Sequence, residues 1–205
     1  GFEYIADVLM KHGFTATAYE GHLKEDFPGL GNMIREGATT LWESYSLATT
    51  RSLNHKMFST ISEWMFRDVA GLGNDPEAPG FKRAVFAPKP GPGFLSHAKT
   101  AYDSESGRFE CGWKTEGGDW ILETSVPPNA ESEVVLPVRV TGGLTVREGD
   151  TEVWKNGAQA AAVPGIRSVT RAPDGLHIST GSGRFRFSCA KESLAGAAGE
   201  TKDKS

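Results

Sequence analysis

The residues GRFECGWKTEGGDWILETSV, positions 107–126, contain two runs typical of strands: the first alternates apolar and polar side chains, and the second contains three consecutive apolar residues, Trp120 to Leu122. A period of two is that of a β-strand with one buried face. Gly117-Gly118 separates the two runs and supplies the glycines that a tight turn favours. The sequence therefore predicts strands at 107–115 and 119–126 joined by a turn.

The same pattern continues on both sides of this pair, from Pro79 toward the end of the chain. Turn residues, among them Asn156-Gly157, separate the runs. Short strands at such even spacing are typical of an antiparallel β-sandwich, predicted here for residues 80–189. Residues 190–205, rich in Ala, Gly, Lys and Glu, are expected to form a flexible tail. The further strands are predicted at 82–87, 96–103, 132–138, 145–147, 166–171, 175–180 and 183–188.

Aromatic residues of the β part alternate with polar ones, as core residues of strands do. We expect most of them to fill the core and not to form a carbohydrate-binding platform. They are Tyr102, Phe109, Trp113, Trp120, Trp154, Phe185 and Phe187.

Before residue 76 the periodicity is helical. A first helix would carry Phe2, Ile5, Val8 and Leu9 on one face and end at Gly13. A second would start at Thr15 or Thr17 and run toward Pro28, and a short one would cover 32–36. Because these few helices cannot close a barrel alone, the apolar flanks of Phe2–Leu9 and Phe58–Leu72 should lack partners.

The strongest helical signal covers residues 54–71. Phe58, Ile61, Met65, Val69 and Leu72 recur at steps of three and four, which predicts one amphipathic helix. Asn54 is the expected N-cap, and Gly71 is the expected stop.

Composition excludes several classes of protein. Hydrophobic residues make up 38% of the 205 residues and charged residues 23%, which is typical of a packed chain. The net charge of −4 offers no basic stripe for nucleic acid, and no apolar run approaches the roughly 20 residues of a membrane span. Cys111 and Cys189 are interpreted as two buried free thiols, with a disulfide between them as the alternative, and no zinc site is expected.

The stretch Thr39-Thr40-Leu41-Trp42-Glu43 carries the candidate chemistry. In a sugar site an indole face covers the apolar face of a pyranose, and a carboxylate polarises water or accepts from a hydroxyl. These five residues alone favour the plainer alternative, a half-buried Trp beside a solvated Glu. Glu36 is expected at the surface, with support of the site as its alternative.

Further motifs follow one another in a fixed order along the chain. They are residues 37–43 (GATTLWE), 52–55 (SLNH) with Phe58 and Trp64, Ala70-Gly71, 75–82 (DPEAPGFK), 88–90 (PKP), 101–104 (AYDS) with Gly107-Arg108, Val126-Pro127, and 181–185 (GSGRF). Together and in this order they resemble the C-terminal third of the α-L-rhamnosidases of glycoside hydrolase family 78. The resemblance covers nearly the whole chain up to Ser188.

The resemblance implies an α+β multidomain fold, in which residues 1–75 supply the closing helices of an (α/α)6 barrel ahead of the sandwich. It also implies hydrolysis of terminal α-L-rhamnosides with inversion. Glu43 would be the general base, while His55, and Trp42 through its indole face, would bind the sugar. Two carboxyl groups and water suffice, so no cofactor or metal is expected.

The resemblance further places the general acid upstream of Gly1. The chain opens without an initiator Met and is expected to be a fragment that is inactive by itself. Its partners would be a rhamnose-containing glycoside or polysaccharide and the missing N-terminal part of the same protein. The sequence assigns no compartment.

Two departures from the family pattern concern the rim of the pocket: Ser44-Tyr45 after Glu43, and a short loop between Glu43 and His55. Two alternatives stay open: an (α/α)6 glycosidase for another sugar, and a non-catalytic sugar-binding or structural sandwich. His55 also has an alternative, a helix-start histidine bonded to backbone.

Overall fold

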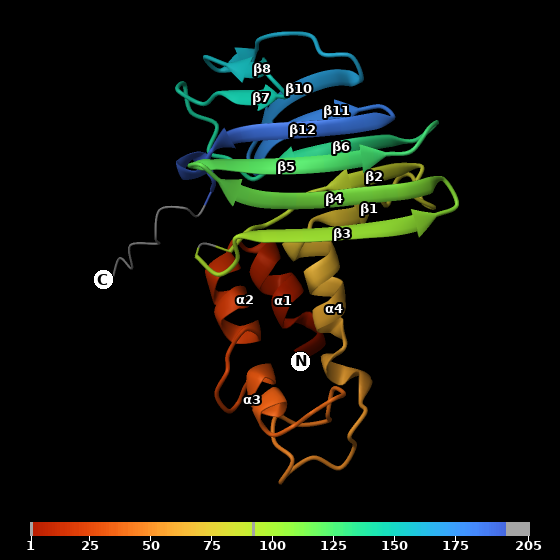
Figure 1. Ribbon diagram of the computed structural model, residues 1–205, viewed down its shortest axis with the longest axis vertical. Helices are drawn as coiled ribbons and strands as arrows, with labels where there is room; N and C mark the ends of the chain where they lie inside the picture. Colours follow the sequence, from red (N-terminus) through yellow and green to blue (C-terminus); the bar gives the residue numbers. More distant parts are fainter. Residues whose placement is uncertain (1, 92, 196–205) are drawn as a thin grey trace. The chain divides into compact units, whose positions relative to one another are not determined.

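The computed structural model describes residues 2–91 and 93–195, without the side chains of Phe2 and Glu3. The chain divides into two compact units, residues 1–65 and 66–205 (Figure 1). The sequence predicted the division near residue 75. That position lies after strand β1 (Leu72–Asn74), which belongs to the second unit.

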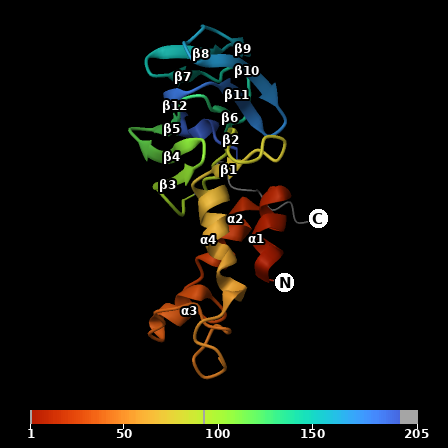
Figure 2. The same ribbon diagram turned by 90° about the vertical axis from the view of Figure 1, so that its right-hand side faces the viewer.

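The first unit is helical. It contains α1 (Phe2–Lys11), α2 (Thr15–His22), α3 (Leu30–Arg35), the 3-10 turn Lys56–Phe58 and α4 (Thr60–Trp64). Gly13 and Gly37 follow α1 and α3 with φ of 81° and 89°, a left-handed conformation that favours glycine and ends a helix. Helix α1 packs against both α2 and α4 (Figure 2).

Trp64 joins α4 to α2. Its ring lies edge-on to Tyr19, with centroids 5.0 Å apart, and stacks on His22 at 4.8 Å. His22 donates from Nδ1 to the Ala18 carbonyl at 2.8 Å, so its buried ring has a backbone partner. All three side chains are buried.

The predicted apolar face of α1 is not the face that α1 buries. Ile5 and Val8 are 46% and 51% exposed, whereas Ala6 and Met10 are buried. The small Ala6 lets α1 approach its neighbours closely, and the larger apolar side chains stay in solvent. This outcome agrees with the expectation for the Phe2–Leu9 flank. The same expectation for the Phe58–Leu72 flank is wrong, because Phe58, Val69 and Leu72 are buried.

The single helix predicted over 54–71 is wrong in two respects. The segment is a 3-10 turn, a short α-helix and a π-helical turn, Met65–Val69, in succession, and the residue that caps its start is His55 instead of Asn54. The π-helical turn leaves carbonyls free of the usual helical pattern. The Val69 carbonyl, the last of the turn, accepts from Trp113 Nε1 of strand β4 at 2.7 Å, and the carbonyl of the next residue, Ala70, accepts from the Cys111 thiol of the same strand.

The second unit is a β-sandwich, whose two sheets form two layers in Figure 2. The first sheet has the order β1-β2-β6-β11-β10. Its strands in that order are Leu72–Asn74, Arg83–Phe86, Glu131–Leu136, Gly175–Thr180 and Ile166–Ala172. An antiparallel sandwich was expected. Three of the four neighbouring pairs in this sheet are antiparallel, but β2 and β6 are parallel.

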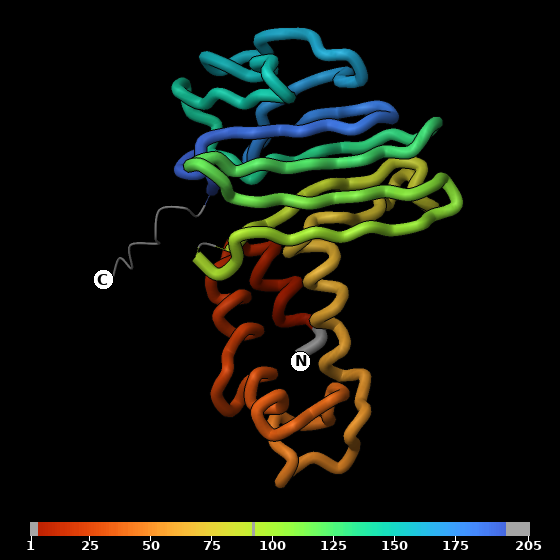
Figure 3. The backbone as a smooth tube through the Cα atoms, viewed as in Figure 1, coloured from red at the N-terminus to blue at the C-terminus, as the bar shows by residue number. Residues whose placement is uncertain are grey.

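The second sheet has the order β3-β4-β5-β12-β7-β8-β9 and is antiparallel throughout. Figure 3 shows how β12 inserts between β5 and β7, far from both in sequence. The strands in sheet order are His97–Ser104, Gly107–Glu116, Asp119–Val126, Gly183–Ala190, Val146–Glu148, Thr151–Lys155 and Ala158–Gln159.

Every predicted strand is present within about two residues of its predicted ends. Sequence reasoning missed β1, β8 and β9. Asn156 and Gly157 have φ of 53° and 81° and form the predicted turn, which joins β8 to β9. These missed strands are short, so their alternation gives little signal.

Inner faces of both sheets meet in one apolar core. Six of the seven aromatic residues that were expected to fill it are buried: Phe109, Trp113, Trp120, Trp154, Phe185 and Phe187. Tyr102 is the exception at 43% exposed, and it packs on the Phe81 ring at a centroid distance of 4.6 Å.

Both cysteines are buried free thiols, as the sequence favoured. Burial raises the pKa of each thiol, that of Cys189 to about 12 with additional help from Asp119 and Glu192. Both therefore stay protonated and unreactive near neutral pH.

The start of the predicted flexible tail is ordered. Residue 190 ends β12, Lys191–Ser193 forms a 3-10 turn, and buried Leu194 bridges to Val138. Residues 196–205 lie outside the described part of the chain.

Candidate active site

Two extended segments of the helical unit run side by side and carry the predicted site residues. Residues 40–43 pair with residues 52–55: the His55 N–H donates to the Leu41 carbonyl at 2.8 Å, and the Glu43 N–H donates to the Ser52 carbonyl at 2.9 Å. The Thr40 hydroxyl donates to the Leu53 carbonyl. This pairing brings Glu43 and His55, twelve positions apart in the sequence, onto neighbouring segments of one unit.

The two paired segments, 40–43 and 52–55, pack on a small apolar cluster. Leu30 and Met33 of α3, with Phe58, surround Trp42, which is only 4% exposed. Stacking on a sugar requires an open indole face, so this burial argues against the predicted sugar contact of Trp42. Trp42 instead anchors the backbone immediately before Glu43.

Glu43 combines a fixed backbone with an uncommitted carboxylate. Its N–H donates to the Ser52 carbonyl and also faces the Thr50 hydroxyl oxygen at 3.2 Å. The side chain is half-buried. Its carboxylate makes no hydrogen bond or ion pair with any other residue in 2–91 or 93–195. Both carboxylate oxygens are therefore available to water or a ligand.

His55 caps the 3-10 turn Lys56–Phe58. Its Nδ1 accepts from the Met57 N–H at 3.2 Å, so the alternative interpretation of a helix-start histidine bonded to backbone is correct. An Nδ1 that accepts leaves the proton of the neutral ring on Nε2. Nε2 has no partner among the described residues, so His55 can cap the helix and donate to a ligand at once.

A carboxylate outside the predicted site residues organises the loop after Glu43. Glu36 is exposed, as expected, and accepts from the Leu47 N–H at 2.6 Å, from Asn32 Nδ2 at 2.8 Å and from the Ser46 hydroxyl. These donors, the Leu47 N–H first, hold the pKa of Glu36 below its ordinary value. The sequence signal for this role is weak: Asn32 and Glu36 are four apart on one helix, but the loop partners are remote.

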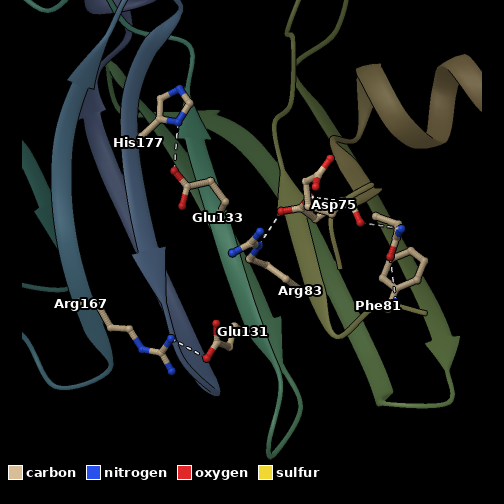
Figure 4. Close-up of polar contacts among 9 residues, drawn as sticks. Asp75, Phe81, Arg83, Glu131, Glu133, Arg167 and His177 are labelled. Atoms are coloured by element: carbon tan, nitrogen blue, oxygen red, sulfur yellow. Dashed lines mark hydrogen bonds and ion pairs between the residues drawn. The ribbon is translucent and has the colours of Figure 1, made fainter. Parts of the chain in front are cut away.

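Motif 75–82, one carrier of the family resemblance, has a structural role in the sandwich (Figure 4). Asp75 accepts from the Glu77 N–H at 2.8 Å and pairs with Arg83 at 2.5 Å, and both contacts lower its pKa. Asn74 Oδ1 accepts from the Phe81 N–H at 2.8 Å. The motif is thus a loop closed at both ends by side chains.

Figure 4 also shows polar contacts between strands of the first sheet, one between the neighbours β6 and β11 and one between β6 and β10. His177 Nδ1 lies 3.0 Å from Glu133, and its Nε2 lies 2.9 Å from Asp174. Arg167 pairs with Glu131 at 2.6 Å. These contacts tie β6, β10 and β11 together, so they explain strand pairing and not chemistry.

Comparison with known families decides what kind of chain this is. Residues 1–69 match the family described as the bacterial alpha-L-rhamnosidase 6 hairpin glycosidase domain, and residues 71–150 match the bacterial alpha-L-rhamnosidase C-terminal domain. The chain belongs to the α-L-rhamnosidase family. The predicted fold class is confirmed, with helices of a six-hairpin glycosidase domain followed by a C-terminal β-sandwich.

Known rhamnosidases resemble the chain in sequence and in structure. An α-L-rhamnosidase of Streptomyces avermitilis is 31% identical over 165 residues, which are 73% of this chain and 16% of that protein. The α-L-rhamnosidase structure from Dictyoglumus thermophilum aligns with a TM-score of 0.78 at 32% identity, over 93% of this chain and 20% of that one. The Streptomyces avermitilis α-L-rhamnosidase complexed with L-rhamnose aligns with a TM-score of 0.72 at 27% identity, over 92% of this chain and 17% of that one.

The chain therefore spans about a fifth or less of the length of these relatives. Within residues 2–91 and 93–195, His, Cys, Asp and Glu side chains form no group of three that could hold a metal ion. No helix in the described part of the chain has the length and apolarity to cross a membrane.

Proposed function

We propose that this chain supplies the general base, Glu43, for inverting hydrolysis of terminal α-L-rhamnosides. The observation that carries the proposal is the pairing of a backbone-fixed, half-buried Glu43 with His55 inside a rhamnosidase-family helical unit. Glu43 would accept a proton from the attacking water, and its carboxylate is free of competing donors for that purpose.

His55 would orient the sugar through Nε2–H, while its Nδ1 stays bonded to the Met57 N–H. This hydrogen bond fixes the tautomer and the ring direction, so the donor is set before the sugar arrives. A rhamnose-containing substrate is supported by the relative whose structure is complexed with L-rhamnose.

Inversion also needs a second carboxyl group that protonates the leaving oxygen, roughly 6.5–9.5 Å from the base so that water fits between them. We assign that acid to residues outside this chain, because its relatives are about five times longer and Glu43 has no carboxyl partner in its own segment pair. By this proposal the 205 residues alone do not turn over substrate.

The test uses the full-length polypeptide that carries these residues. Glu43→Gln removes the base but keeps the size of the side chain, and it should lower kcat on an aryl α-L-rhamnoside by roughly 10²–10⁴-fold. Glu20→Gln is the matched control, since Glu20 is exposed on α2 and makes no hydrogen bond or ion pair in the described part of the chain. Turnover by Glu43→Gln at the control rate would remove Glu43 from the base role.

Two further measurements decide the finer points. NMR of the first product formed should show the anomer of inverted configuration, and a retained anomer would contradict the mechanism. A panel of aryl glycosides separates a rhamnosidase from a six-hairpin glycosidase that acts on another sugar.

A further inference from the structure

The loop that follows Glu43 is fastened to helix α3 by the side chain of Glu36. Glu36 Oε2 accepts from the Leu47 N–H at 2.6 Å, and both of its oxygens lie 3.0 Å from the Ser46 hydroxyl. Asn32 Nδ2 donates to Glu36 Oε1 and to the Tyr45 carbonyl, each at 2.8 Å. Three consecutive loop residues, 45–47, are therefore bonded to one turn of α3.

From this attachment a short series of hydrogen bonds leads to Glu43. The Ser46 carbonyl accepts from the Thr50 N–H at 3.1 Å. The Thr50 hydroxyl donates to the Ser52 carbonyl at 2.9 Å, and its oxygen faces the Glu43 N–H at 3.2 Å. The Ser52 carbonyl accepts from that same Glu43 N–H. Glu36 is thus linked to the Glu43 backbone through Ser46 and Thr50.

The hydrogen bonds that Glu36 accepts require its carboxyl group to be ionised. Every group that contacts its two oxygens is a donor, and a carboxylate can accept from all of them at once. The Leu47 N–H and the Asn32 amide lower the pKa of Glu36 accordingly. Because the side chain is exposed, its hold on the loop comes from several charge-assisted hydrogen bonds and not from burial.

We propose that Glu36 is a positioning residue that holds loop 44–50 against α3 and so fixes the backbone of Glu43. Its catalytic consequence rests on the proposed function of Glu43, whereas its effect on the loop does not. A displacement of about 1 Å at a reacting group can cost around 10²-fold in rate. Loss of Glu36 should therefore lower kcat more than it raises KM, because the groups that bind the sugar stay in place.

The first experiment measures the loop directly. Hydrogen exchange of the backbone amides of Glu43, Leu47 and Thr50 is compared in the full-length polypeptide that carries these residues, as wild type, as Glu36→Ala and as the control Glu20→Ala. Glu36→Ala should accelerate exchange of the three amides at least tenfold, while exchange in α1 and α2 is unchanged. Equal exchange in Glu36→Ala and Glu20→Ala would overturn the proposal whatever Glu43 does.

Glu36→Gln provides a graded variant of the same size. One amide oxygen replaces two carboxylate oxygens, so either the Leu47 N–H or Asn32 Nδ2 must face the new NH2 group. Exchange should lie between wild type and Glu36→Ala. If Glu36→Gln matches wild type, the charge has no part in holding the loop and the proposal fails.

The second experiment measures turnover of an aryl α-L-rhamnoside by the full-length polypeptide. Glu36→Ala should lower kcat between tenfold and a hundredfold with KM within about threefold of wild type. Faster exchange with an unchanged kcat would overturn the positioning role. Should Glu43→Gln itself stay active, the proposed function falls, and the exchange data alone then decide whether Glu36 holds the loop.

Discussion

The sandwich and the helical unit bury their tryptophans in different surroundings. Trp120 is fully buried and is one of 24 described buried residues that form the sandwich core, most of them on strands of the two sheets. Trp42 is nearly as buried, but its cluster has only four buried members, and two of them, Leu30 and Met33, come from a six-residue helix. When a side chain in a dense core is truncated, the close-packed neighbours cannot fill the cavity. In a small cluster covered by loops, the loop residues can move into it.

The same contrast holds for polar groups. In the sandwich, side chains such as Asp75 and Asn74 close a loop of the scaffold itself. In the helical unit, Glu36 and Asn32 bond a loop that leads back to a carboxylate without a partner among the described residues. In the sandwich these hydrogen bonds stabilise the scaffold, whereas in the helical unit they hold the loop that follows Glu43 in place.

The largest expected difference between the two regions concerns the buried tryptophans. Trp120→Ala should lower the free energy of unfolding of the sandwich by roughly 3–5 kcal/mol. The Trp120 indole N–H has no hydrogen-bond partner among the described residues, so the loss is one of packing. Trp42→Ala should cost roughly 2–3 kcal/mol, because the loops around it can collapse. Urea denaturation followed by circular dichroism gives both values, and a Trp42 effect larger than that of Trp120 would reverse the comparison.

A smaller effect separates the cap that the structure contains from the cap that the sequence predicted. His55→Ala removes the acceptor of the Met57 N–H and should lower the free energy of unfolding of the helical unit by about 0.5–1 kcal/mol. Asn54→Ala is the matched control and should stay within about 0.5 kcal/mol of wild type. Thermal denaturation of both variants at one pH shows which of the two side chains caps the helical turn. Greater damage from Asn54→Ala would restore the predicted N-cap.

The smallest expected effect is a pH dependence of the sandwich. The pKa of Asp75 is lowered by the Glu77 N–H and Arg83, so its stabilisation is complete above the ordinary value of 3.8 and is lost as pH falls through the folded-state value. Asp75→Asn should lower Tm by about 1 °C at neutral pH, less than His55→Ala does. The gap, that is the difference in Tm between wild type and Asp75→Asn, should narrow as pH falls below 3.8.

Asp150→Asn is the control for this titration, since Asp150 lies in the exposed turn between β7 and β8. It should show no gap at any pH. A gap for Asp75→Asn that persists unchanged in acid would mean that its carboxylate charge contributes nothing.

The strands were the most predictable elements because their signal is local. Side chains at positions i and i+2 share a face, so 119–126 and 175–180 were predicted with the ends that the structure has. The helix over 54–71 was less so. Apolar spacing indicated helical residues there, but it contains nothing about the π-helical turn Met65–Val69, at whose end the carbonyls of Val69 and the following Ala70 bond to β4.

The candidate site divides in the same way. Glu43 and His55 could be named from their motifs, because residue type and order are properties of the sequence. The burial of Trp42 and the role of Glu36 could not be, since both depend on partners brought close by folding.

By itself the sequence determined the helical start, nine of the twelve described strands of the β part, most apolar residues of the sandwich core and the rhamnosidase family. Only the tertiary structure decided that β12 inserts between β5 and β7, that β2 and β6 run parallel, and which carboxylate holds the loop beside Glu43. The physical reason is range. Alternation and helical spacing act between neighbours in the chain, whereas a hydrogen bond selects its partner by distance in space.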